Sequence, residues 1–150
     1  LWGSLTQLAS ATDPHGSEIR MLFVGDIMLD GGPGHWVTSG RDPFEHVAPL
    51  LQGADLTIGN LECVLGSEGD QVLKPYVFRG PGQACLYLNR YFDAVSLANN
   101  HTLDFGPEGL VGMLTLLEQS QLPYFGAGRN PEQANRPLVL QCKGKRIALL

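Results

Sequence analysis

The sequence has 150 residues, of which 43% are hydrophobic and 17% are charged, and its formal net charge is −5 at pH 7. A chain of this length and composition buries about two thirds of its unfolded surface, which is enough for one globular domain. Its 10 Lys and Arg residues form no basic stripe, and no apolar run reaches the roughly 20 residues of a membrane span, which argues against nucleic acid as a partner and for a soluble chain.

Apolar runs mark the strands of the predicted domain. Residues 1–18 show no sustained periodicity and are predicted to form a flexible lead-in, with one domain following over 19–150. Four short apolar segments predict strands of a largely parallel sheet, at 19–24, 54–59, 94–98 and 122–125. An antiparallel hairpin is expected from residue 138 onward.

Helix signals separate these strands. Capping residues and apolar periodicity predict helices that start near Asp42, Gln83, Pro107 and Asn130. Two segments rich in Gly and Pro, 31–34 and 66–82, are predicted to be loops, the second lying over the functional site. Strand and helix therefore alternate through most of the chain, which predicts the α/β class. Residues 147–150 have the composition of a buried strand with no turn after it, so we expect the C-terminus to truncate a longer domain.

Polar side chains accompany the ends of three predicted strands. Asp26 follows the first strand, Asn60 and Glu62 follow the second, and the triplet Asn-Asn-His at 99–101 follows the third. Because ligands of an open α/β sheet collect outside the carboxyl ends of its strands, these clusters are expected to converge on one pocket.

The side chains of these clusters are ones that bind metal ions. Two carboxylates a few Å apart repel each other unless a cation lies between them. Oxygen atoms from Asp26, Glu62 and an Asn amide, together with the imidazole of His101, suit Mn²⁺, Fe²⁺ or Zn²⁺. Asn60 and Glu62 are two residues apart, so on an extended segment both project from the same face.

Each cluster also has a purely structural interpretation. Asp26 could cap a turn, and Asn60 and Glu62 could form a solvated strand end. The triplet at 99–101 is harder to explain in this way, because each unsatisfied polar group that is buried costs about 1–3 kcal/mol.

Three further residues have two interpretations each. Asp104 either orients His101 from behind, as carboxylates commonly do for imidazoles, or caps the helix that opens at Pro107. Lys74 and Arg79 lie in the predicted loop at 66–82 and either bind an anionic substrate or belong to an ordinary solvated loop.

The motifs together resemble the bacterial capsule synthesis protein family, the CapA or poly-γ-glutamate synthesis proteins, within the calcineurin-like metallophosphoesterase superfamily. The matching stretches follow one another in order from residue 21 to the end of the chain: 23–29 (FVGDIML), 42–45 (DPFE), 54–62 (ADLTIGNLE), 74–79 (KPYVFR), 96–101 (SLANNH), 104–106 (DFG) and 126–130 (GAGRN).

The resemblance implies the N-terminal half of a metallophosphatase-like α/β/β/α sandwich. By position, Asp26 resembles the first metal-binding aspartate, and Glu62 or Asn60 resembles the acidic group that binds or bridges a second metal. Asn100 and His101 resemble the Asn-His pair, in which the Asn binds metal and the His stabilises or protonates the leaving group.

The sequence departs from the phosphoesterase pattern at two places. Met28 stands where the histidine of an Asp-x-His motif is usual, and the segment 60–62, Asn-Leu-Glu, replaces the usual Gly-Asp. Further histidine motifs of the family lie in a second half that this chain lacks. The resemblance therefore implies half of a site.

The function implied by the resemblance is capsule or poly-γ-glutamate biosynthesis or export, with a divalent metal of unknown identity. Two alternatives stay open. One is an active metal-dependent phosphoesterase or other hydrolase with His101 and Asp104 as its catalytic pair, and the other is a non-catalytic protein that binds an anionic polymer through Lys74 and Arg79. The resemblance implies a location at the cell surface, in the periplasm or outside the cell, with membrane contact only through a missing anchor or partner proteins.

Overall fold

A parallel sheet forms the centre of the computed structural model, which describes residues 18–150. The sheet has the order β1-β2-β5-β6, and all of its neighbouring strands are parallel: β1 (Met21–Ile27), β2 (Leu56–Leu61), β5 (Ala94–Ser96) and β6 (Tyr124–Phe125). This arrangement confirms the α/β class. Most of the predicted lead-in, residues 1–17, lies outside the described residues.

Helices and two small strand pairs complete the described part of the chain. The helical elements are α1 (Gly31–Thr38), the 3-10 turn η1 (Glu45–Val47), α2 (Ala48–Leu51), α3 (Ala84–Tyr91), α4 (Gly106–Gln119) and α5 (Pro131–Ala134). The remaining strands are the short parallel pair β3 (Val64–Leu65) and β4 (Arg79–Gly80) and the antiparallel hairpin β7 (Leu138–Cys142) and β8 (Lys145–Leu149). The predicted hairpin and the helices that begin near Gln83 and Pro107 are thus confirmed.

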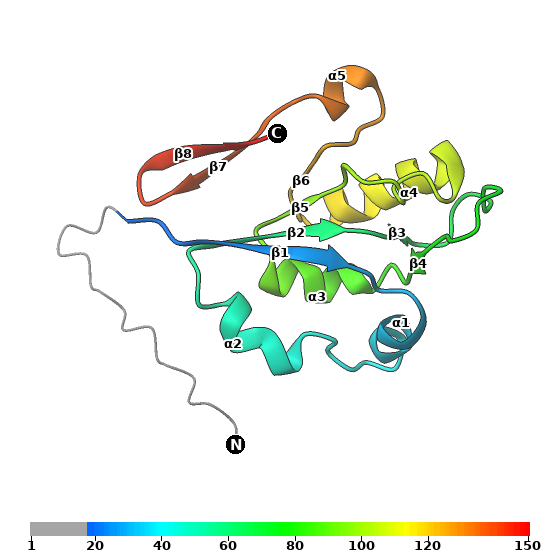
Figure 1. Cartoon of the computed structure of the whole chain (residues 1–150), viewed down its shortest axis with the longest axis horizontal. Helices are drawn as coiled ribbons and strands as arrows, with labels where there is room; N and C mark the ends of the chain where they lie inside the picture. Colours follow the sequence, from blue (N-terminus) through cyan, green and yellow to red (C-terminus); the bar gives the residue numbers. More distant parts are fainter. Residues whose placement is uncertain (1–17) are drawn as a thin grey trace.

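The two faces of the sheet are covered by different elements. The helices α2 and α3 lie on one side, and the β7–β8 hairpin lies on the other (Figure 1). On the hairpin side, Leu56, Ile58 and Ala94 form a small cluster with Leu149. Phe23 stands beside Ile58 in the β1–β2 register but is 62% exposed, so the hairpin covers only part of this face.

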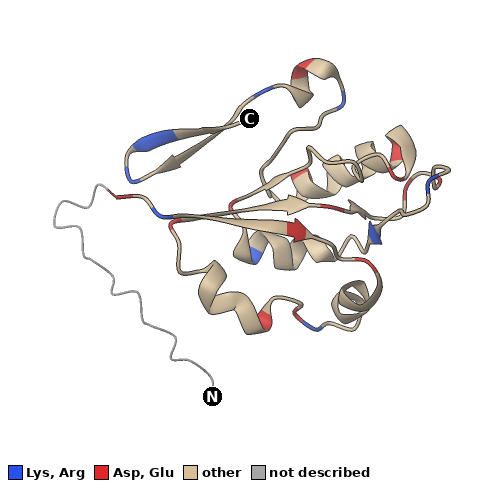
Figure 2. Ribbon diagram, viewed as in Figure 1, with Lys and Arg blue, Asp and Glu red and all other residues tan. Residues whose placement is uncertain are grey.

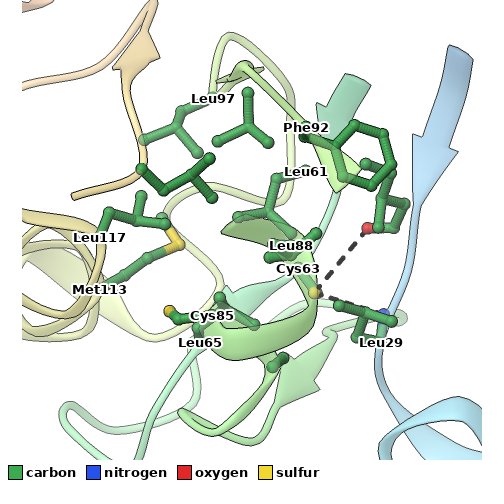
Figure 3. Close-up of a cluster of buried hydrophobic side chains, with 14 of the residues drawn as sticks. Leu29, Leu61, Cys63, Leu65, Cys85, Leu88, Phe92, Leu97, Met113 and Leu117 are labelled. Carbon is green, nitrogen blue, oxygen red and sulfur yellow. Dashed lines mark hydrogen bonds between the residues drawn. The ribbon is translucent and has the colours of Figure 1, made fainter. Parts of the chain in front are cut away.

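The larger core lies on the helix side of the sheet. Figure 3 shows Leu61 and Leu88 close to Cys63 in the interior of this core. The thiol of Cys63 accepts a hydrogen bond from the Leu29 N–H and donates a long one to the Ile27 carbonyl oxygen. Burial raises the pKa of the Cys63 thiol to about 12, so this cysteine is a protonated core residue and not a thiolate ligand.

The prediction of a loop at 31–34 is wrong, because these residues form the first turn of α1. Asp30 caps this helix, because its Oδ1 accepts a hydrogen bond of 2.6 Å from the Gly31 N–H. Pro33 lies in the first turn, where a missing N–H costs nothing. A Cβ at position 34 would lie 2.6 Å from the Leu29 carbonyl oxygen. Glycine at this position therefore allows α1 to lie close to the segment that follows β1.

No helix in the described part of the chain combines the length and the apolar character that a membrane span requires. Positively and negatively charged residues are interspersed along the helices, strands and loops of the ribbon (Figure 2).

Candidate functional site

An irregularity in strand β1 places Asp26 at the carboxyl edge of the sheet. Phe23 pairs with Ile58 and Asp26 pairs with Asn60, so β1 has one more residue than β2 between these two points. Such a bulge changes the face on which the following side chains project. Asp26 therefore lies inside the strand, and not after it as predicted, and its side chain shares a face with Asn60.

The amide of Asn60 joins the two carboxylates. Its Nδ2 donates to Asp26 Oδ1 over 2.8 Å and to Glu62 Oε2 over 2.9 Å. Asn60 lies inside β2, and not after it as predicted, at the same edge as Asp26, and Glu62 directly follows Leu61, the last residue of β2. The convergence of these three residues, which was expected from the order of the strands, is present in the structure.

The carboxyl groups of Asp26 and Glu62 differ in proton affinity. Hydrogen bonds from Asn60 and from the Glu62 carboxyl lower the pKa of Asp26. The hydrogen bond that Glu62 gives to Asp26, together with partial burial and the negative charge nearby, raises the pKa of Glu62. Two carboxyl groups this close favour sharing one proton, because ionising both brings like charges together.

A second asparagine holds Asn60 in this orientation. Asn99 Nδ2 donates to Asn60 Oδ1 and to the Leu61 carbonyl oxygen, each over 2.9 Å. The Oδ1 of Asn99 accepts from the His101 N–H over 2.9 Å and from the Thr102 hydroxyl over 3.2 Å. Because Asn60 Oδ1 faces this donor, its Nδ2 faces the carboxylates. The sequence singled out Asn99 only as part of a triplet, and its place in the network depends on the turn after β5.

His101 is buried behind the two carboxylates. Its Nδ1 lies 2.7 Å from Asp104 Oδ2, and its Nε2 lies 3.7 Å from Glu62 Oε1. The ring of Phe78 packs against the imidazole with 4.4 Å between the ring centres. One ring nitrogen is thus tied to the interior of the protein, and the other faces the edge where Asp26 and Glu62 meet.

Asp104 occupies the interior side of this arrangement and is completely buried. Burial alone would raise its pKa, but hydrogen bonds from Lys74, His101 and the Phe78 N–H outweigh that effect and lower it. The helix α4 has Phe105 at its N-cap position with no side-chain cap. In the structure Asp104 is therefore hydrogen-bonded to the His101 imidazole and does not cap α4.

The two cations of the 66–82 segment make internal hydrogen bonds. Lys74 Nζ donates to Asp104 Oδ1 over 2.6 Å and to the Asn100 carbonyl oxygen over 2.8 Å. The guanidinium of Arg79 donates to the carbonyl oxygens of Gly66 and Gly69 and lies 3.6 Å from the centre of the Phe105 ring. Substrate binding by Lys74 and Arg79 stays a prediction, and these bonds show that both side chains already have structural partners.

Asn100, the predicted metal ligand of the third cluster, is exposed. It enters the network through its carbonyl oxygen, which accepts from Lys74. Its role as a ligand stays a prediction.

The fit of a metal ion to this edge is incomplete. Within residues 18–150 no group of three or more His, Cys, Asp and Glu side chains is arranged to hold a metal ion. The oxygen atoms of Asp26 and Glu62 and the Nε2 of His101 have the chemistry that Mn²⁺, Fe²⁺ or Zn²⁺ prefers. Their number and spacing do not complete a coordination shell.

The fold and the strand-edge network define an α/β protein with a polar site at the carboxyl ends of its parallel strands. Residues 20–150 match the family model of the bacterial capsule synthesis protein PGA_cap. The chain belongs to this family.

Curated relatives agree with the family match. The capsule biosynthesis protein CapA of Bacillus anthracis is 27% identical over 140 residues, which cover 89% of this chain and 34% of that protein. The PGA biosynthesis protein CapA of Bacillus subtilis strain 168 is 24% identical over 162 residues, covering 100% of this chain and 41% of that protein. The uncharacterized protein y4sH of Sinorhizobium fredii is 28% identical over 138 residues, covering 87% of this chain and 29% of that protein. The chain thus spans less than half the length of each of these relatives.

Proposed function

We propose that this chain belongs to a protein of capsule or poly-γ-glutamate biosynthesis or export, and that its strand-edge network is a divalent-metal-dependent hydrolytic site. The observation that carries the proposal is the position of His101, whose Nδ1 is bound to buried Asp104 while Nε2 faces the carboxyl groups of Glu62 and Asp26. A substrate at this edge would be a phosphoester or an amide of an anionic polymer. The names of the Bacillus relatives support the biosynthetic role.

The chemistry assigned to His101 follows from its two ring nitrogens. The Nε2 is placed to take up a proton from an attacking water molecule and to return it to the departing group. Asp104 stabilises the charged ring that forms between these two events, as a buried carboxylate does when it is hydrogen-bonded to Nδ1.

Asp26, Glu62 and a neighbouring Asn would hold the proposed divalent ion, which when bound supplies positive charge for the substrate and activates water. The donor atoms of Asp26 and Glu62 already converge on one point, the Asn60 amide nitrogen. Further ligands would come from the part of the relatives that has no counterpart in this chain.

The proposal includes the finer architecture, an α/β/β/α sandwich. The exposed Phe23 supports it, because this side chain lies on the face of the sheet that the β7–β8 hairpin leaves partly open. A second sheet packed there would bury it. The proposal also includes a location at the cell surface, which the capsule-related names of the relatives support.

The alternative is a non-catalytic protein that binds an anionic polymer. In this alternative Lys74 and Arg79 would bind the polymer, and the internal hydrogen bonds of both side chains argue against that role. Catalysis is therefore the function that the geometry favours.

Hydrolysis by the protein at its natural length tests the proposal. We expect Mn²⁺- or Fe²⁺-dependent cleavage of phosphoesters or of poly-γ-glutamate, with a loss of about 10²–10⁴-fold in His101→Gln because a proton-transfer group is removed. His35→Gln is the matched control, since His35 is exposed on α1. Unchanged turnover in His101→Gln would rule out this assignment, and polymer binding without turnover would favour the alternative.

A further inference from the structure

Residues 70–76, which we call the strap, connect two fixed points of the chain. Before the strap, the Gly69 carbonyl oxygen accepts a hydrogen bond of 2.8 Å from the Arg79 guanidinium. Gly69 also lies so close to the Phe105 carbonyl oxygen that a Cβ at this position would clash with it. After the strap, Phe78 packs against the large core. Contacts outside the strap therefore hold both of its ends.

The strap itself directs one side chain inward. All of its residues are exposed except Lys74, and none of them belongs to a helix or a strand. The apolar side chains of Leu73 and Tyr76 are exposed to solvent. Burial of apolar side chains therefore contributes little to holding the strap against the protein, and its polar contacts decide its position.

The hydrogen bonds between the strap and the rest of the described chain all reach the turn at 100–104. Lys74 Nζ donates to Asp104 Oδ1 over 2.6 Å and to the Asn100 carbonyl oxygen over 2.8 Å. The Val72 N–H donates to the Asp104 carbonyl oxygen over 3.0 Å. The side chain of Lys74 is 27% exposed and that of Asp104 is 0% exposed, so water screens this ion pair less than it screens a pair on the surface.

We propose that Lys74 latches the strap onto the turn at 100–104 and that the strap opens as a unit while its two ends stay in place. When the Lys74 contacts break, one backbone hydrogen bond, from Val72, is left to hold the strap. A segment with so few buried apolar contacts opens locally at a much lower free energy than the unfolding of the whole domain.

Opening of the strap would change the surroundings of the candidate site. His101 and Asp104 are buried, and the ammonium of Lys74 lies 3.3 Å from His101 Nδ1 and 2.6 Å from Asp104 Oδ1. Moving Lys74 away would open both residues to solvent or to a ligand from this side. The strap thus controls access to the turn, and because its motion does not require hydrolysis, the inference goes beyond the proposed function.

Hydrogen exchange of backbone amides, followed by NMR of the ¹⁵N-labelled chain at constant pH, tests the inference. The Val72 N–H reports on the strap. The Val95 N–H, bonded to the Pro123 carbonyl oxygen over 3.0 Å within the sheet, reports on unfolding of the domain. We expect Val72 to exchange faster than Val95 but more slowly than an unprotected amide. Low concentrations of urea should speed exchange at Val95 and leave Val72 unchanged, because opening of the strap exposes little surface.

Lys74→Met removes the latch and keeps a side chain of similar length. Since a hydrogen bond to a charged partner is lost, we expect the exchange rate of Val72 to rise about 10- to 100-fold. Tyr76→Met is the matched control, because it changes an exposed side chain of the same strap. It should leave the exchange rate of Val72 unchanged.

Four results would overturn the inference: no protection of Val72 in the unsubstituted chain, a Val72 rate that rises with urea in parallel with Val95, an unchanged Val72 rate in Lys74→Met, or an equal rise in Tyr76→Met. The first two need no variant, so the inference is tested even if Lys74→Met does not fold. Because no turnover is measured, a protein with the expected exchange rates but no hydrolysis would contradict the proposed function and leave the latch standing.

Discussion

Asp26 lies opposite Asn60 at the carboxyl edge of the sheet, and its Oδ1 accepts a hydrogen bond of 2.8 Å from the Asn60 amide. The bulge in β1 produces this pairing, because it adds one residue between Phe23 and Asp26. The same amide group reaches Glu62 over 2.9 Å. One neutral side chain thus donates to two carboxyl groups that would repel each other if both were ionised.

Asn60→Asp replaces this shared amide by a third carboxyl group of nearly the same shape. In metal-free buffer at neutral pH we expect the midpoint of thermal unfolding to fall by a few °C, because like charges then meet at the strand edge. Added Mn²⁺ should recover the loss. The matched control is Asn89→Asp on the exposed side of α3, and equal midpoints for both variants with no effect of Mn²⁺ would contradict the expected repulsion.

Asp104→Asn removes the buried carboxylate and keeps its shape. We expect a loss of about 2–3 kcal/mol in the free energy of unfolding, since the ammonium of Lys74 and the ring of His101 lose a charged partner that is shielded from water. Urea denaturation measures it. Asp70→Asn, at an exposed loop position, should change the free energy of unfolding by less than about 0.5 kcal/mol, and a similar small effect of Asp104→Asn would show that the buried ion pair adds no stability.

The stabilisation that Asp104 gives to the folded chain should be lost on acidification. Its pKa in the folded chain lies below the ordinary value of 3.8, so the unfolded chain binds its proton more readily. The stabilisation is therefore fully present above pH 3.8 and is lost as the pH falls through the lower pKa of the folded state. The difference in unfolding free energy between the unsubstituted chain and Asp104→Asn should be constant at neutral pH and shrink on acidification, and a difference that grows there would reverse the sign of the argument.

Gly34→Ala and Gly32→Ala form a matched pair within α1. A Cβ at Gly34 meets a backbone oxygen at 2.6 Å, whereas a Cβ at Gly32 has no neighbour within 4 Å. We expect Gly34→Ala to destabilise the chain by about 1–3 kcal/mol and Gly32→Ala to stabilise it by about 0.5–1 kcal/mol. Urea midpoints check both, and equal effects of the two substitutions would show that α1 does not pack closely on the Leu29 carbonyl.

The sequence predicts those parts of the fold that depend on local patterns. Apolar runs identify β2 and β5, and the spacing of Leu110, Met113 and Leu117 identifies α4. The helix α1 escapes prediction because its Gly-rich composition opposes a helix, and only the cap at Asp30 and the tight approach of Gly34 explain it.

The sequence predicts where the candidate site lies, but it does not predict all of the hydrogen bonds between its residues. Strand order brings Asp26, Glu62 and His101 to one edge, as the topology of an open α/β sheet requires. The inward direction of Lys74 and the choice of Asn99 as the residue that orients Asn60 depend on loop conformations that single-residue patterns do not encode.

Paramagnetic broadening by Mn²⁺ tests the central claim most directly, namely that distant segments build one ion-binding edge. Substoichiometric Mn²⁺ added to the ¹⁵N-labelled chain should broaden the backbone signals of Asp26, Glu62 and His101 first, and Asp26→Asn should weaken the effect. Broadening centred on other acidic residues, such as Asp55 or Glu118, or no selective broadening at all, would contradict the account.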